Sequence, residues 1–234
     1  MRYPRVILGF AASVALSAAV PSPSVAPLPG AAPLPIGQLG WEGVVIDGEP
    51  PVEVWGASFE DIEAKIRAQY NPDFSIYTKE ENKPPAVSEN NALVARTQLE
   101  ARQRNINCDQ RYGDAQSLYV DEGINHLRRV NGNSCKARAR TCILNMCVWT
   151  SGIGMCNDNT WDIDIPCTTI ADYAQVIGMN CAWMPHPECH GPDCTVAPWN
   201  LFEKGQAFSP HLSWNVIVGS CSFWGATGER PVKA

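Results

Sequence analysis

In the first half of the chain, apolar residues recur every three or four positions, which is the spacing of an amphipathic helix. The hydroxyl of Ser58 can cap such a helix, and the Asn71-Pro72 pair is expected to end it. Its apolar stripe would consist of Phe59, Ile62, Ile66 and Tyr70. A second, weaker helix is predicted over residues 91–104. The polar residues between the two helices are expected to form a flexible connection.

The second half shows the same spacing in two further stretches. Residues 118–130 are predicted to form a helix that either Asp114 or Ser117 caps. The clearest helix would begin after Thr169, its expected N-cap, and run to Cys181. Residues 141–149 and 214–223 instead alternate in the manner of strands. Helices and strands in this order predict an α+β domain, in which an antiparallel sheet carries two packed helices.

The N-terminus has the pattern of a secretory signal. Arg2 and Arg5 precede an apolar run from Val6 to Ala19 that is too short to span a membrane. We therefore predict a signal peptide over residues 1–19.

The next segment, residues 20–104, contains no cysteine, and it is rich in proline at its start and acidic later. We predict a disordered or helical linker and pro-segment here, which a protease removes near Arg102 or Arg104. The alternative is an uncleaved N-terminal extension. The mature domain would then comprise residues 105–234.

All ten cysteines lie in this last region. Because an exported chain meets no reducing thiol pool, we expect five structural disulfides and no free thiol. The pairing does not follow from the sequence. The cysteines concerned are Cys108, Cys135, Cys142, Cys147, Cys156, Cys167, Cys181, Cys189, Cys194 and Cys221.

Charge argues against a nucleic-acid partner. The net charge is −6, and residues 1–104 and 105–234 each hold 9 basic and 12 acidic residues. Neither part is basic, so the electrostatic footprint of a nucleic-acid-binding protein is missing.

Two clusters contain residue types that can bind metal ions. His186, Cys189, His190 and Cys194 carry zinc-type ligands, but their spacing fits no standard zinc site and oxidation competes for the thiols. The acidic run around Asp158 could bind calcium, but it lacks the glycine and the closing glutamate of an EF-hand. We expect a loop with Asx turns there and no cofactor. The polar residues of that run are Asp158, Asn159, Asp162 and Asp164.

For acid–base catalysis, Glu122 and His126 lie one turn apart on a predicted helix, and His211 is a further candidate. Since exposed pairs of this kind are common without catalysis and no supporting motif is present, we predict that the protein is not an enzyme. A secreted hydrolase remains the alternative.

Partner contacts are expected at cationic and aromatic residues. In a strand, Lys136, Arg138 and Arg140 would all point the same way and form a basic ridge. Trp183 and Trp199 flank the proline- and cysteine-rich loop and could bind a partner.

In the order of several short motifs, residues 105–221 resemble small cysteine-rich proteins that filamentous fungi secrete. The resemblance extends, more distantly, to the KP-four type killer toxins of smut fungi. The motifs are the helix that follows Cys108, Gly154-Met155-Cys156-Asn157-Asp158, Thr169 to Gln175 leading to Cys181, Gly205-Gln206-Ala207, and Trp214 to Cys221. The resemblance implies an α/β sandwich held by five disulfides and a toxin or effector without an enzymatic step. The killer toxins are associated with calcium-channel block, but their important lysine has no matching position, and Lys136 is only a nearby cation.

We therefore predict a secreted effector or killer-type toxin. It would act as a monomer, bind a surface or extracellular component of a host or competitor cell, and not insert stably into a membrane. Two alternatives stay open, a ribonuclease-like secreted hydrolase and a structural protein that binds the cell wall.

Overall fold

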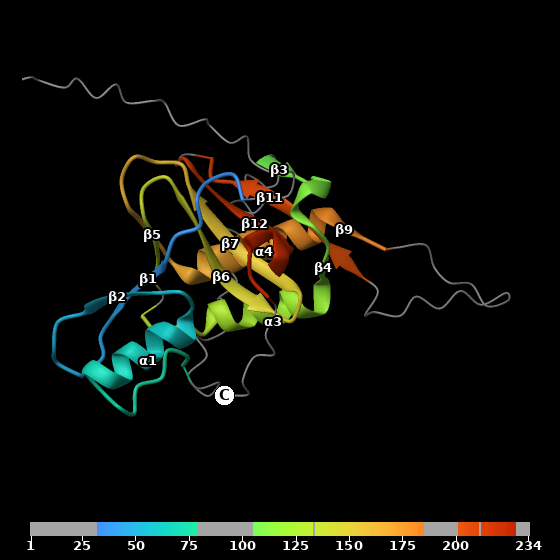
Figure 1. Ribbon diagram of the computed structural model, residues 1–234. Helices are drawn as coiled ribbons and strands as arrows, with labels where there is room; N and C mark the ends of the chain where they lie inside the picture. The colour runs from blue at the N-terminus through green and yellow to red at the C-terminus, as the bar shows by residue number, and fades with distance from the viewer. Residues whose placement is uncertain (1–31, 79–104, 133, 185–200, 211, 228–234) are drawn as a thin grey trace, which may run out of the picture.

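The computed structural model describes residues 32–78, 105–132, 134–184, 201–210 and 212–227. Within these ranges the chain forms three α-helices and three antiparallel sheets, so the predicted α+β class is confirmed (Figure 1). The signal peptide, the helix predicted over residues 91–104, and Arg102 and Arg104 lie outside the described residues.

The largest sheet has five strands in the order β3-β11-β12-β7-β6. Helices α3 and α4 pack against each other and against this sheet. Because side chains alternate along β12, Val216 and Val218 join the main core on the helix side, whereas Ile217 packs with Phe223 and Trp224 on the other side. The elements are β3 (Ile106–Asn107), β6 (Thr141–Val148), β7 (Ser151–Asn157), β11 (Gly205–Phe208), β12 (Trp214–Ser220), α3 (Ser117–Arg128) and α4 (Cys167–Cys181).

Two smaller sheets flank the first. One has the strand order β2-β1-β5-β8, and the other has the order β4-β10-β9. Short 3₁₀ helices, η3 (Gln110–Tyr112) and η5 (Cys221–Trp224), complete the described fold. The remaining elements are β1 (Leu39–Gly43), β2 (Val52–Gly56), α1 (Phe59–Gln69), β4 (Ala115–Gln116), β5 (Cys135–Ala137), β8 (Ile163–Ile165), β9 (Ala182–Trp183) and β10 (Phe202–Glu203).

The three helix predictions that fall on described residues are confirmed in position, and two of them differ in the cap. Helix α1 starts after Ser58, whose hydroxyl accepts a hydrogen bond from the Asp61 amide at 3.3 Å, as predicted. Helix α3 follows Gln116 and has no side-chain cap. Helix α4 begins at Cys167, so Thr169 lies inside the helix and is not its cap. Pro166 precedes the first turn of α4 and sets the earlier start.

The two predicted strands are present with different ends. Strand β6 covers the predicted stretch and contains an irregularity between Leu144 and Met146 where it pairs with β7. Strand β12 ends at Ser220, since the Ser220 hydroxyl caps the 3₁₀ turn that begins at Cys221.

The N-terminal region contains more ordered structure than its sequence predicts. Residues 32–78, called here the N-terminal unit, form the β1–β2 hairpin and α1, and strand β1 pairs with β5 of the cysteine-rich region. Trp41, Ile62 and Ile66 are fully buried in the same core as the residues around α3 and α4. Each buried side chain of this size contributes about 1.5–3 kcal/mol, which explains why the unit is folded. The expectation of a disordered or helical linker and pro-segment is therefore wrong for residues 39–77, which contain two paired strands and belong to the core.

Disulfides cross-link the cysteine-rich region. The four described bridges are Cys108–Cys181, Cys135–Cys167, Cys142–Cys156 and Cys147–Cys221, and none of the described cysteines is free. Cys189 and Cys194 lie outside the described residues. Several bridges in one domain indicate an oxidising compartment.

None of the helices among the described residues is long and apolar enough to cross a membrane.

Candidate functional site

Three connections meet at one end of the five-stranded sheet, which we call the loop end. Asn157, the last residue of β7, lies opposite both Thr141, the first residue of β6, and Trp214, the first residue of β12. This register brings together the β5–β6 connection (138–140), the β7–β8 connection (158–162) and the β11–β12 connection (209–213). The loop end therefore gathers chain segments that are far apart in the sequence.

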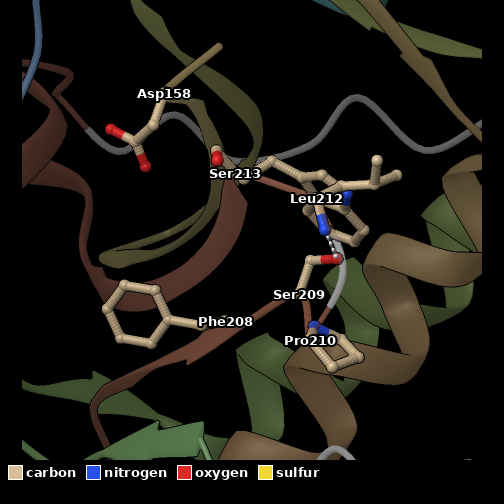
Figure 2. Close-up of a pocket in the computed structure, with 7 residues that line it drawn as sticks. Asp158, Phe208, Ser209, Pro210, Leu212 and Ser213 are labelled. Atoms are coloured by element: carbon tan, nitrogen blue, oxygen red, sulfur yellow. Dashed lines mark hydrogen bonds between the residues drawn. The ribbon is translucent and has the colours of Figure 1, made fainter.

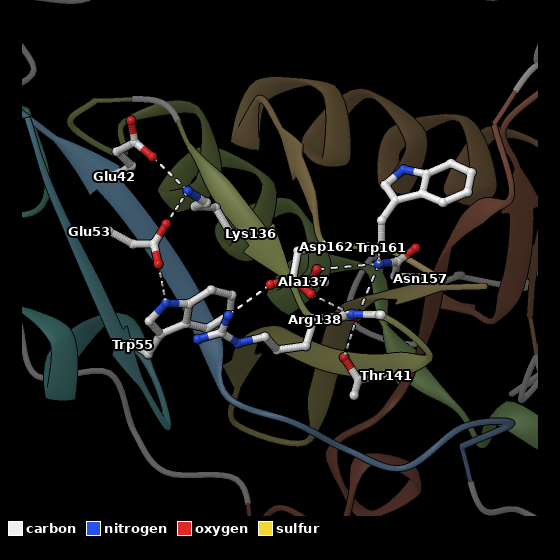
Figure 3. Close-up of polar contacts among 11 residues, drawn as sticks. Glu42, Glu53, Trp55, Lys136, Ala137, Arg138, Thr141, Asn157, Trp161 and Asp162 are labelled. Carbon is white, nitrogen blue, oxygen red and sulfur yellow. Dashed lines mark hydrogen bonds and ion pairs between the residues drawn. The ribbon is translucent and has the colours of Figure 1, made fainter. Parts of the chain in front are cut away.

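The buried side chain of Asn157 ties the first two of these connections together. Its Nδ2 donates to the carbonyl oxygens of Ala137, Arg138 and Trp161 at 3.3, 3.0 and 2.8 Å (Figure 3). Its Oδ1 accepts from both the amide and the side chain of Asn159. A buried amide that is satisfied on both sides makes a rigid polar junction.

Asn159 extends this network to the third connection. The Nδ2 of Asn159 donates to the carbonyl oxygen of Ser213 at 3.0 Å, and the Asp158 amide donates to the same oxygen at 2.8 Å. The carbonyl oxygen of Asn159 accepts from the Arg140 amide at 3.1 Å. All three connections are thus fixed through one strand end.

Arg138 presents its guanidinium at this end on an aromatic support. The guanidinium carbon lies 3.8 Å from the centroid of the Trp55 ring, and Nη1 forms an ion pair with Asp162 at 2.8 Å (Figure 3). The Ala139 amide, together with Arg138, lowers the pKa of the Asp162 carboxyl. Stacking and the ion pair hold an exposed cation in one orientation.

The Lys136 side chain, by contrast, is mostly buried and forms ion pairs with residues of the protein itself. Only 14 % of its side chain is exposed, and its Nζ donates to Glu42 at 2.6 Å and also to Glu53. Burial opposes the charged form, but the hydrogen bonds to these two carboxylates outweigh it and raise the pKa of Lys136. The positive charge of the ammonium group is therefore balanced by two carboxylates of the β1–β2 hairpin.

The predicted basic ridge does not form as one face. Strand β5 ends at Ala137, and Arg140 adopts a left-handed backbone conformation with φ of 55°. The alternation needed to align three cations is therefore lost after Arg138. Arg138 and Arg140 are both exposed, and no described residue forms an ion pair with Arg140.

Trp161 adds an exposed aromatic surface to the loop end. Its side chain is 60 % exposed, and Figure 3 shows the indole extending away from the polar network, although its carbonyl oxygen is bound by Asn157. Tryptophan is a residue type that often dominates binding energy, and here a fixed backbone holds its ring in an exposed position.

A shallow hollow of about 450 Å³ lies at the same end, beside the β11–β12 connection (Figure 2). Phe208 and Leu212 contribute exposed apolar surface, and Asp158 contributes a carboxylate that accepts from Asn215 Nδ2 at 3.0 Å. His211 belongs to this connection but lies outside the described residues. The described residues that line the hollow are Asp158, Phe208, Ser209, Pro210, Leu212, Ser213 and Trp214.

The acidic run does not assemble as a calcium site. Asp162 binds Arg138, Asp164 accepts from Ser134 at 2.7 Å, and the Asn159 amide closes an Asx turn on Asn157. Among the residues that the structure describes, no three His, Cys, Asp or Glu side chains come together in a way that could hold a metal ion. The residues with zinc-type side chains, from His186 to Cys194, lie outside those residues.

His126 is engaged in packing between α3 and the N-terminal unit. Its ring lies 5.4 Å from the ring of Tyr77, and its Nδ1 is buried without a hydrogen-bond partner. Burial, together with the nearby Arg129, lowers the pKa of His126. The Glu122 carboxylate acts on the pKa of His126 in the opposite direction, but among the described side chains no hydrogen bond joins the two residues.

Trp183, a predicted partner contact, lies away from the loop end. Trp183 is in β9, where its ring packs near Phe202 and under the Lys204 ammonium, whose Nζ is 4.7 Å from the ring centroid. Figure 1 places β9 and β5 on opposite sides of the molecule, so Trp183 does not join Arg138 in one surface. Trp199 lies outside the described residues.

A buried carboxyl group beside α4 has no counterpart in the sequence-based predictions. Glu203 in β10 is 3 % exposed and lies against Gly178, where a side chain would collide with the carboxylate. Burial and the nearby Asp121 carboxylate raise the pKa of Glu203 to about 8. Glu203 is buried because β10 pairs with two short strands, β4 and β9, that are distant in the sequence. No local sequence pattern predicts this burial.

No protein-family model, curated protein or solved structure matches this chain.

Proposed function

We propose that this protein is a secreted effector or killer-type toxin that binds an extracellular or surface component of another cell without catalysing a reaction. The loop end would be its contact surface. The partner of Arg138 and Trp161 would be a component of a host or competitor cell, and the protein would bind it as a monomer.

The observation that carries this proposal is the combination of exposure and rigidity at the loop end. Arg138 and Trp161 are exposed, yet the backbone carbonyl groups of both residues are bound by one buried side chain, Asn157. Tryptophan and arginine are enriched among the residues that dominate binding energy. A surface that is ordered before binding loses little conformational entropy on association.

Charge narrows the chemistry of the partner. Arg138 and Arg140 favour an anionic group at short range, and Trp161 offers a flat apolar face. The chain as a whole carries a net charge of −6, so long-range attraction to an acidic surface is not expected. We infer a contact that depends on close complementarity and varies only modestly with salt.

The test compares the wild-type protein with three variants. The wild-type chain and its Trp161→Ala, Arg138→Ala and Arg111→Ala variants are secreted, purified without reductant, labelled and titrated onto plant cells and competing fungal cells. Arg111 is a matched control for Arg138, since it is exposed, forms an ion pair with Asp109 at 2.6 Å and lies over a tyrosine ring.

We expect saturable binding by the wild type, together with growth inhibition or cell death. Trp161→Ala and Arg138→Ala should weaken binding by about 10-fold or more, as for hot-spot residues. Arg111→Ala should bind as the wild type does. A wild type that neither binds nor affects either cell type, or three variants that bind equally, would refute the proposal.

A further inference from the structure

The N-terminal unit and the cysteine-rich region have no disulfide between them. All ten cysteines occur from Cys108 onward, and residues 32–78 contain none. A protease that cuts between Thr78 and Asn105 would therefore leave two chains without a covalent link. We propose that the N-terminal unit nevertheless stays bound, so that the processed protein is a non-covalent complex of two chains and not the 105–234 fragment alone.

Backbone hydrogen bonds tie both ends of the N-terminal unit to the cysteine-rich region. At its start, the Gly37 amide donates to the Cys142 carbonyl oxygen at 2.7 Å, and the Cys142 amide donates to Pro35 at 2.9 Å. At its end, the Thr78 amide donates to the Arg129 carbonyl oxygen at 2.8 Å, and the Asn131 amide donates to Ile76 at 2.6 Å. A cut after Thr78 falls beyond the last of these attachments.

Strand pairing joins the two parts in the middle. Strand β1 lies between β2 and β5, and Gly40 pairs with Lys136. The side chain of Lys136 is itself held by Glu42 and Glu53 of the hairpin. Departure of the unit would leave an open edge on β5 and would break both ion pairs of Lys136.

Buried side chains of the unit also take part in the contact. Trp41 is fully buried, and its Nε1 donates to the Asn131 carbonyl oxygen at 2.5 Å. Gly132 permits this approach, because a Cβ at its position would lie 2.7 Å from the Glu42 carbonyl oxygen. Ile62, Ile66 and Ile76 are also fully buried. The surface of the cysteine-rich region is therefore shaped for this unit and would expose a large apolar area without it.

The experiment cuts the folded full-length chain. A recognition sequence for a site-specific protease replaces residues 88–94, the intact protein is folded and checked by circular dichroism, and the cut is then made without reductant. Native mass spectrometry and size-exclusion chromatography report whether the chains remain together. We expect one species containing both chains, which urea separates without any reductant. Separation of the two chains in native buffer would overturn the proposal.

A matched pair of variants tests the contact itself. Trp41 is fully buried and binds the Asn131 carbonyl oxygen of the cysteine-rich region, whereas Tyr70 is 43 % exposed. Each variant is folded as an intact chain before it is cut. We expect Trp41→Ala to weaken retention by 10-fold or more and Tyr70→Ala to change it by less than 2-fold. Equal retention of the two variants would show that the packing does not hold the unit.

The naturally secreted protein gives an independent result. Its native complex is isolated and both N-termini are sequenced. A cleaved protein that retains a chain covering residues 32–78 supports the proposal, and a purified complex that contains only the chain from residue 105 onward contradicts it.

Discussion

The N-terminal unit and the cysteine-rich region share one core but are stabilised by different means. The unit, residues 32–78, has no cysteine and depends on buried side chains such as Trp41 and on its pairing with β5. The region from Cys108 to Cys221 carries four described disulfides across its helices and strands. Packing stabilises the folded state, whereas disulfides act mainly by restricting the unfolded chain.

Because of this difference, a substitution in the core should affect the stability of the two parts unequally. A core substitution in the unit removes packing that no covalent link replaces, whereas the cysteine-rich region keeps its bridges. The sharpest test of the comparison is therefore the residue on which the unit depends most.

We expect Trp41→Ala to have the largest effect, a loss of about 3–5 kcal/mol in the free energy of unfolding. The fully buried indole leaves a cavity, and its hydrogen bond to the Asn131 carbonyl oxygen is lost. Urea unfolding without reductant measures the change. Trp161→Ala is the control, because Trp161 is 60 % exposed and should cost less than about 0.5 kcal/mol. Equal costs for the two variants would contradict the packing described here.

Removal of single disulfides should come next in size. The Cys147–Cys221 bridge spans 74 residues and the Cys142–Cys156 bridge spans 14. Loop-closure entropy predicts losses of about 4 and about 3 kcal/mol for the corresponding double alanine variants. Urea unfolding of both variants checks the order. A larger loss for the shorter loop would show that strain or packing around the bridges outweighs chain entropy.

The buried carboxyl of Glu203 should make stability depend on pH. Its folded-state pKa is raised to about 8, above the usual value of 4.5, so between these values the folded state holds a proton that the unfolded state has released. The free energy of unfolding should therefore fall by about 1.4 kcal/mol per unit as pH rises from 5 to 7.

The variant Glu203→Gln should remove this contribution. Denaturant titrations at pH 5, 6 and 7 are compared for the two proteins. The slope with pH should be shallower in the variant, and the variant should be the more stable at pH 7. Parallel curves for wild type and variant would show that Glu203 does not hold the proton.

The smallest effects concern the two cations of β5 and its connection. Arg138→Ala should cost less than about 1 kcal/mol, since the ion pair with Asp162 is exposed. Lys136→Ala should cost about 1–3 kcal/mol, because the Lys136 side chain is mostly buried and its loss breaks the ion pairs with both Glu42 and Glu53. Thermal unfolding of both variants decides the order. A greater cost for Arg138→Ala would reverse the roles assigned to the two residues.

Local patterns in the sequence were sufficient for the helices and the long strands. Ser58 and the stripe that includes Ile62 and Ile66 predict α1, and the alternation after Thr141 predicts β6. The β1–β2 hairpin escaped prediction because its strands have only five residues each and one of them pairs with β5, far along the chain. Pairing over such a distance leaves little trace in the local sequence.

The candidate site shows the same division. The pattern from Lys136 to Arg140 predicts one basic ridge, but the environments of the cations depend on Glu42, Glu53 and Asp162, which come from other elements. The Asx turn around Asn157 was predictable from its residue types. The role of Asn157 as the junction of three connections was not, because it arises from the register of β6, β7 and β12.

Native-state hydrogen exchange of the intact, non-reduced chain tests most directly whether the two parts form one cooperative core. Exchange is followed amide by amide at increasing denaturant concentration. We expect the protected amides of β1 and β2 to exchange through the same global unfolding as those of β7 and β12. Exchange of β1 and β2 through an opening several kcal/mol below the global value, with β7 and β12 still protected, would contradict a shared core.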